Sequence, residues 1–106
     1  MKGNINFPFL GKVFYFSTFG GMIVKKVAVV SAILEEPELY QKEFNSIVSD
    51  YKSIIVGRMG IPMDEWKIAV ISLTVVGPLD QINSLTGKLG NIPHVLVKTA
   101  ISKKEL

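Results

Sequence analysis

Two stretches of the chain are apolar at both odd and even positions. They lie within residues 23–34 and 66–76, where residues 27–30 and 68–71 carry only apolar side chains. A short segment that is apolar on both faces is typical of a strand with neighbours on both sides. We therefore expect these two segments to form the central strands of a sheet.

Each predicted central strand is followed by apolar side chains at helical spacing. The first helix is expected to start within Glu35-Glu36-Pro37-Glu38, because proline suits the first helical position and carboxylates suit the positive end of the helix dipole. Its apolar stripe consists of Tyr40, Phe44, Ile47, Val48 and Tyr51.

The second helix is predicted to follow Gly77-Pro78. Its apolar stripe consists of Leu79, Ile82, Leu85, Thr86 and Leu89. Gly87 is expected to allow close packing of this helix, and Gly90 is expected to end it in a left-handed conformation.

Two further strands are predicted at residues 53–61 and 94–101. The first contains Gly57 and Gly60, which favour an edge strand or a bulge. Residues 61–65 are predicted to be a short antiparallel connection into the third strand, which starts at Trp66. The tail, residues 102–106, is expected to be frayed.

The resulting order is β-α-β-β-α-β, which predicts a ferredoxin-like α+β sandwich: a four-stranded antiparallel sheet with two helices on one face. Because the helices cover one face only, apolar residues remain on the other. A large exposed apolar patch normally marks an interaction surface. We therefore expect sheet-to-sheet or edge-to-edge homo-oligomers, most simply a two-fold dimer.

Composition separates an N-terminal segment, residues 1–21, from the domain at residues 22–106. The segment holds six of the ten aromatic residues and two of the three net positive charges. It has neither the uninterrupted apolar run of a signal peptide nor that of a spanning helix. We interpret it as a non-native or misassigned start preceding Met22, as an arm ordered in an oligomer or, least favoured, as a membrane attachment, and we expect no membrane partner. The rest is nearly neutral, without the basic cluster of a nucleic-acid-binding protein.

Catalytic and metal-binding residues are not predicted. Cysteine is absent, which excludes thiolate sites and disulfides and fits a cytoplasmic protein. The single histidine, His94, has no evident orienting partner, so neither an enzyme nor a metal or other cofactor is expected. Residues 87–90 form a Gly-x-x-Gly unit, but at a helix end rather than between two helices, and the central strands lack stacking aromatics. Nucleic-acid binding by this chain alone is therefore not expected.

Three segments carry a resemblance to a known family. These segments are residues 56–62, 85–92 and 95–99. Through them the chain resembles the iron-only hydrogenase system regulators, and the resemblance extends from about residue 22 to residue 102. The resemblance implies an ACT-like, ferredoxin-like fold and a regulatory role near hydrogenase maturation genes. It also implies similarity to the sensing domain of nickel-responsive repressors. The several histidines and the cysteine of those repressors are absent here, as is a DNA-binding helix pair in residues 1–21.

The turn before the first helix differs from that of amino-acid-binding ACT domains. Glu38 stands where those domains usually carry a glycine that lets a ligand approach the backbone, which argues against amino-acid binding. The hypothesis we favour is an oligomeric regulatory module, a dimer or tetramer, that binds a small effector or a protein partner. The alternatives are a structural adaptor that binds a protein through its sheet face, and a small enzyme with an active site shared between subunits.

Five residues are candidates for effector binding. Leu34, Glu35 and Glu36 form the turn after the first strand, and Arg58 lies beside glycines in the second strand. A guanidinium group at such a position is suited to bidentate binding of an anion. The fifth candidate is Lys88, near the end of the second helix, where it also complements the negative end of the helix dipole.

Overall fold

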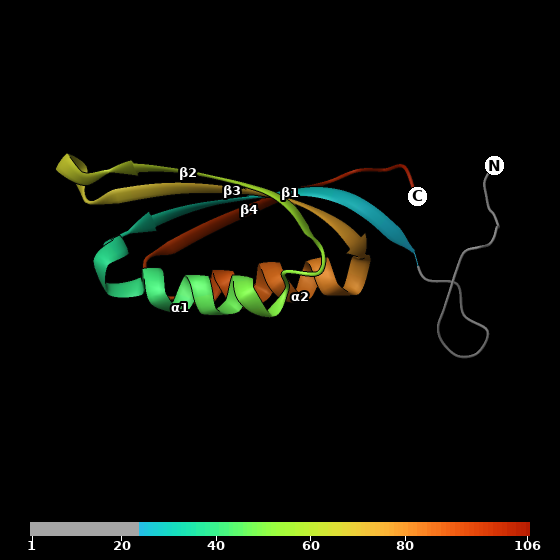
Figure 1. Ribbon diagram of the computed structural model, residues 1–106, viewed down its shortest axis with the longest axis horizontal. Helices are drawn as coiled ribbons and strands as arrows, with labels where there is room; N and C mark the ends of the chain where they lie inside the picture. Colours follow the sequence, from blue (N-terminus) through green and yellow to red (C-terminus); the bar gives the residue numbers. More distant parts are fainter. Residues whose placement is uncertain (1–23) are drawn as a thin grey trace.

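Strands and helices follow the predicted order in the computed structural model, which describes residues 24–106 (Figure 1). The elements are β1 (Lys25–Glu35), α1 (Pro37–Asp50), β2 (Ile55–Met63), the 3-10 turn η1 (Asp64–Trp66), β3 (Ile68–Pro78), α2 (Leu79–Gly90) and β4 (Val95–Ile101). Both helices lie on one side of a four-stranded antiparallel sheet. This arrangement is the predicted ferredoxin-like α+β fold. The segment 1–21 lies outside the described residues.

The sheet has the strand order β2-β3-β1-β4. The two strands that are apolar on both faces, β1 and β3, are therefore the central ones, as predicted. β2 is an edge strand, and its register with β3 shifts between Ile55 and Gly57, so the glycine-containing strand has both an edge position and a bulge. Ser31 of β1 and Ser72 of β3 pair with each other near the middle of these two strands.

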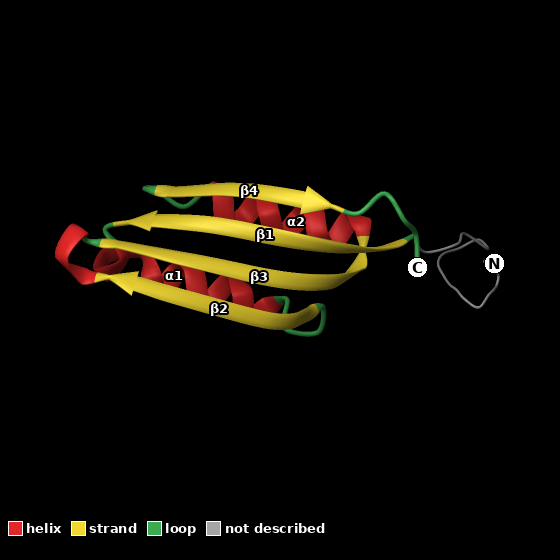
Figure 2. Cartoon of the chain, turned by 90° about the horizontal axis from the view of Figure 1, so that it is seen from above, coloured by secondary structure: helices red, strands yellow, loops and turns green. Residues whose placement is uncertain are grey.

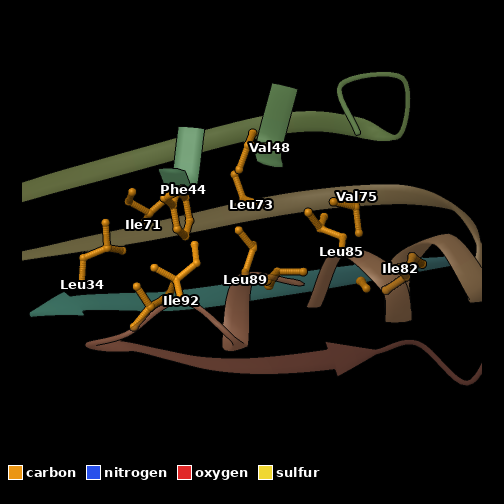
Figure 3. Close-up of a cluster of buried hydrophobic side chains, with 14 of the residues drawn as sticks. Leu34, Phe44, Val48, Ile71, Leu73, Val75, Ile82, Leu85, Leu89 and Ile92 are labelled. Atoms are coloured by element: carbon orange, nitrogen blue, oxygen red, sulfur yellow. The ribbon is translucent and has the colours of Figure 1, made fainter. Parts of the chain in front are cut away.

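The core lies between the sheet and the two helices (Figure 3). Alternate residues of β1 and β3 point into it, and both predicted helical stripes face them. Its largest fully buried side chains are Phe44, Leu34, Leu73, Ile82, Leu85, Leu89, Val30 and Val75. Tyr40 and Tyr51 are half-buried and pack against its margin. The two helical stripes therefore supply the side chains predicted for them.

The hairpin between β2 and β3 differs from the prediction. Pro62 and Met63 also belong to β2, and Trp66 lies in η1 rather than at the start of the third strand. Lys67 follows with a left-handed φ of 54°, and its N–H donates to the carbonyl of Asp64 at 3.2 Å. This tight turn delays the start of β3 to Ile68. Proline is tolerated in β2 because the strand lies at the edge of the sheet.

The glycines at the end of α2 do not have the predicted roles. The helix ends through Asn91, which has a right-handed conformation and whose N–H donates to the carbonyls of the last turn. A Cβ added at Gly87 or Gly90 would meet nothing within 4 Å, so no close packing depends on either. Gly77 is the glycine that requires its lack of a side chain, because a Cβ there would lie 2.6 Å from Cγ2 of Ile54.

The C-terminal tail is not frayed, contrary to the prediction. The N–H of Ser102 donates to the carbonyl of Val27 at 2.8 Å, and the N–H of Leu106 donates to the carbonyl of Lys25 at 3.0 Å. The Ser102 hydroxyl also accepts from the N–H of Val27 at 3.2 Å. The tail thus continues alongside the first residues of β1, beyond the end of β4.

Candidate effector-binding groove

The pattern of β2 is the reverse of the pattern expected for a strand on a core. Arg58, Gly60 and Pro62 pair with Leu73, Ile71 and Ala69 of β3, and Leu73 and Ile71 point toward the helices. Side chains of directly paired residues share a face of the sheet. From Arg58 to Pro62 the helix side of β2 therefore carries a guanidinium, a glycine and a proline, whereas a strand over a core normally places large apolar side chains there, as β2 does at Ile55.

A groove of about 270 Å³ occupies the space that β2 leaves unfilled. A Cβ added at Gly60 would meet nothing within 4 Å. The groove runs between the first turns of α1 and the helix side of β2. It is lined by Pro37, Glu38, Gln41, Arg58, Gly60, Ile61, Pro62, Asp64, Ile68, Ala69 and Ile71.

A second hollow, of about 170 Å³, adjoins the groove at the start of α1. Pro37, Glu38 and Asp64 line both, so the two are neighbours. Its walls include Glu36 and Lys67, whose φ angles of 67° and 54° are left-handed. Such conformations are unfavourable for residues other than glycine, and they concentrate at functional sites. The N–H of Glu36 donates to the carbonyl of Lys67 at 3.1 Å, which holds the two strained residues together.

Among the described residues, Arg58 uses only a small part of its hydrogen-bonding capacity. Its Nη2 donates to Oδ1 of Asn45 on α1 at 2.7 Å, and within residues 24–106 this neutral amide is its only side-chain partner. A guanidinium has five N–H donors in a planar fork. The bond to Asn45 thus positions the group at the groove without neutralising its charge.

The predicted site residues have separate positions in the structure. Glu36 lines the hollow and Arg58 lines the adjoining groove, so these two belong to one region. Leu34 is fully buried in the core. Glu35 pairs with Ile68 and lies exposed on the sheet face opposite the helices, and Lys88 lies on α2 beside Tyr51.

Sequence reasoning missed several groove residues. Glu38 and Gln41 lie one helical turn apart on α1 and face the groove, and Asp64 and Lys67 contribute from the turn around η1. For η1 the sequence offers no signal, because the hollow forms only when α1 packs beside the hairpin. For β2 the parity of Arg58, Gly60 and Pro62 was a usable signal.

Lys88 belongs to a different polar cluster, between the end of α1 and the middle of α2. The hydroxyl groups of Tyr51 and Ser84 are hydrogen-bonded at 2.6 Å, and Nζ of Lys88 lies 5.2 Å from the centre of the Tyr51 ring. The hydrogen bond with Ser84, and then the Lys88 ammonium group, lower the pKa of the Tyr51 phenol below its usual value. The phenol in turn raises the pKa of Lys88.

Removing the Ser84 hydroxyl is expected to raise the pKa of Tyr51 back toward its usual value. Because folding lowers this pKa, phenolate formation favours the folded state, and Tyr51 adds stability as the pH rises through its titration. Two-dimensional NMR of the Tyr51 ring across alkaline pH in the parent and in Ser84→Ala measures the shift. Ser46→Ala on α1 is the control. An unchanged Tyr51 titration in Ser84→Ala would contradict the assignment.

The single histidine has a structural position. The His94 ring stacks on Tyr40 with centroids 5.5 Å apart, and its carbonyl accepts the N–H of Glu35 at 2.8 Å. Residues 24–106 contain no group of three or more His, Cys, Asp or Glu side chains that could hold a metal ion. In the same part of the chain, no helix is long and apolar enough to cross a membrane.

Comparison with known proteins identifies the family. Residues 26–99 match the sequence profile described as "TM1266-like: Iron-only hydrogenase system regulator, putative". The chain belongs to this TM1266-like family. Among solved structures, it is similar to that of the uncharacterized protein TM1266 from Thermotoga maritima, with 32% sequence identity and a TM-score of 0.71. The similarity covers 74% of this chain and 99% of TM1266. No curated protein matches.

Membership of the TM1266-like family confirms the resemblance inferred from the sequence. The three segments that carried it lie mainly in β2, in the last part of α2 and in β4, all within the matched residues. The family description gives the coarse function, a regulator in the iron-only hydrogenase system. The groove beneath β2 lies within the same matched region.

Proposed function

We propose that this TM1266-like protein regulates the iron-only hydrogenase system by binding a small effector in the groove between α1 and β2. The observation that carries the proposal is the reversed pattern of β2, which leaves the groove open and places Arg58 on its wall. In this proposal the protein acts in the cytoplasm, catalyses no reaction and does not contact DNA by itself.

The lining of the groove indicates the chemistry of the effector. Arg58 can bind an anionic group through two parallel N–H donors, because its partner Asn45 uses only part of the guanidinium. Glu38 and Asp64 line the same groove and favour a hydrogen-bond donor on another part of the molecule. Ala69 and Ile71 offer an apolar wall. The combined space of groove and hollow suits a molecule smaller than a typical drug.

A thermal-shift screen of organic acids, amino acids, nucleotides and metal salts tests the proposal. An effector that binds the folded state stabilises it by about 1.4 kcal/mol at ten times its Kd. For a domain of this size, that corresponds to a rise of roughly 6–11 °C in the melting temperature. The rise is expected in the parent and in Lys42→Gln, a charge-matched control elsewhere on α1, and not in Arg58→Gln.

Two results would overturn this function. Absence of a shift across the whole panel would favour the adaptor, in which a protein partner binds without a small ligand. An equal shift in Arg58→Gln and in the parent would show that the effector binds outside the groove.

A further inference from the structure

No segment within residues 24–106 covers the sheet face opposite the helices, which is called here the open face (Figure 2). In Figure 2 all four strands lie in front of both helices. The apolar side chains of the open face are Met59, Ile61 and Met63 of β2, Ile68, Val70 and Val76 of β3, Val27, Val29 and Ile33 of β1, and Leu96 and Ala100 of β4. Five of them, Val29, Ile33, Met59, Ile61 and Leu96, are between 39% and 62% exposed.

One apolar row crosses the open face from edge to edge. Leu96 pairs with Ile33, Ile33 with Val70, and Val70 with Ile61, so the row includes one residue from each strand. The adjoining row contains Ser31 and Ser72 at the middle of the sheet. A continuous apolar row favours an interface centre, because the buried core of an interface is more apolar than the rest of a protein surface.

The pattern of β2 supports burial of the open face. Within residues 58–63 of this strand, Met59, Ile61 and Met63 point away from the helices, while Arg58, Gly60 and Pro62 lie on the helix side. Nearer the start of the strand, Ile55 packs against the core. Apolar side chains of a strand normally mark its buried side. Over residues 58–63 the apolar side of β2 is therefore the open face, which favours its burial by something outside the described fold.

We propose that a second copy of this chain covers the open face, sheet against sheet, in a two-fold dimer. Four strands about 4.8 Å apart and roughly 25–35 Å long present about 500–650 Å² in plan. Because side chains stand above the flat sheet, the solvent-accessible area of the open face is larger than this. It comes close to the about 800 Å² that each partner buries in a stable interface of standard size. An identical sheet matches this outline in both dimensions.

The face is self-complementary under a two-fold axis that runs along the strands. Such an axis places β4 of one copy over β2 of the other, and β1 over β3. Leu96 then faces Ile61 of the second copy, Ile33 faces Val70, and Ser31 faces Ser72. The face carries three charged side chains, Lys25 and Glu35 at the two ends of β1 and Lys98 on the edge strand β4, and none of them meets a like charge in this register. Sheet twist turns the two copies by about 30°, so this register holds best near the centre.

Light scattering after size exclusion, together with sedimentation over a range of concentrations, tests the dimer with the full chain. Leu96→Glu and Ile61→Glu are each expected to raise the dimer dissociation constant at least about 30-fold, since each would bury a carboxylate against an apolar side chain. Leu39→Glu is the matched control, because Leu39 is 68% exposed on α1, away from the open face. Circular dichroism of each variant below the dissociation constant checks that the monomer remains folded.

Cross-linking distinguishes the open face from the edge of the sheet. The chain has no cysteine, so single replacements report one position each. A short bismaleimide is expected to link Ser31→Cys efficiently, and to link neither Ser46→Cys on α1 nor Val56→Cys on the exposed β2 edge. Preferential linking of Val56→Cys would show edge-to-edge pairing and overturn the proposal.

Two other results would also overturn the proposal. A monomer up to about 100 µM would leave the open face to a different protein, as would a dimer that both glutamate variants leave unchanged. The dimer can be tested apart from the effector groove, because Leu96 lies on the open face and does not line the groove, whereas Ile61 borders both surfaces. A dimer that binds no effector, or an effector-binding monomer, would therefore be distinguishable results.

Discussion

Replacing Phe44 by alanine is expected to lower the free energy of unfolding by about 3–5 kcal/mol. Phe44 lies on the inner face of α1, is completely buried, and is the largest of the fully buried side chains. In Figure 3 its ring lies among side chains that include Ile71 of β3 and Ile92 of the turn after α2. Its removal would lose the transfer free energy of the ring and leave a cavity that the surrounding strands can close only in part.

A loss of this size is large for so small a domain. Domains typically have about 5–15 kcal/mol of stability in total, and small ones lie at the lower end. Phe44→Ala is therefore expected to unfold at a much lower urea concentration. Leu39→Ala, on the same helix but exposed, should change the stability by less than about 0.5 kcal/mol. Equal midpoints for the two variants would contradict the position of α1 on the sheet.

The topology was predictable because each step depended on a local pattern. Apolarity on both faces identified β1 and β3 as the central strands, and Pro37 located the start of α1. Gly57 and Gly60 indicated the edge position and the bulge of β2. Each of these signals reflects burial or backbone geometry within one element, which a sequence encodes directly.

The errors involve either local backbone geometry that residue types do not specify or contacts between distant segments. Gly90 matched a helix stop, but Asn91 ends the helix in a right-handed conformation with bonds to the last-turn carbonyls. The tail looked frayed because its own residues are polar, whereas its order comes from hydrogen bonds between Ser102 and Val27, more than seventy residues apart. Trp66 was assigned to a strand because the left-handed turn at Lys67 has no sequence signature.

The candidate site was predictable in part for the same reason. Arg58 was selected by residue type and by its neighbours, and the structure places it on the groove wall. Glu36 was selected from the turn before α1 and lines the adjoining hollow. The opposite wall of the groove depends on how α1 packs against the sheet, so Glu38 and Gln41 were not predicted. Lys88 was selected as well, but it lies on α2, in a part of the surface away from the groove.

Replacing Leu34 by alanine is expected to cost about 2–5 kcal/mol of unfolding free energy. Although Leu34 belongs to the turn selected as a candidate effector site, its side chain is fully buried, and its backbone pairs with both Ala69 and Val95. Its role is therefore to anchor the end of β1 in the core. Urea unfolding measures the loss, and the slope with denaturant should stay unchanged if the native fold is retained.

Glu35→Ala is the matched control for this substitution. Glu35 is the next residue along β1, was selected with Leu34, and is exposed on the opposite face of the sheet. Its replacement should change the stability by less than about 0.5 kcal/mol. If Leu34→Ala were as stable as Glu35→Ala, the end of β1 would not be packed as described. The contrast between Leu34 and Glu35 thus identifies Leu34 as the structural residue of this turn. Glu36, the third residue of the turn, is the one that lines the hollow beside the groove.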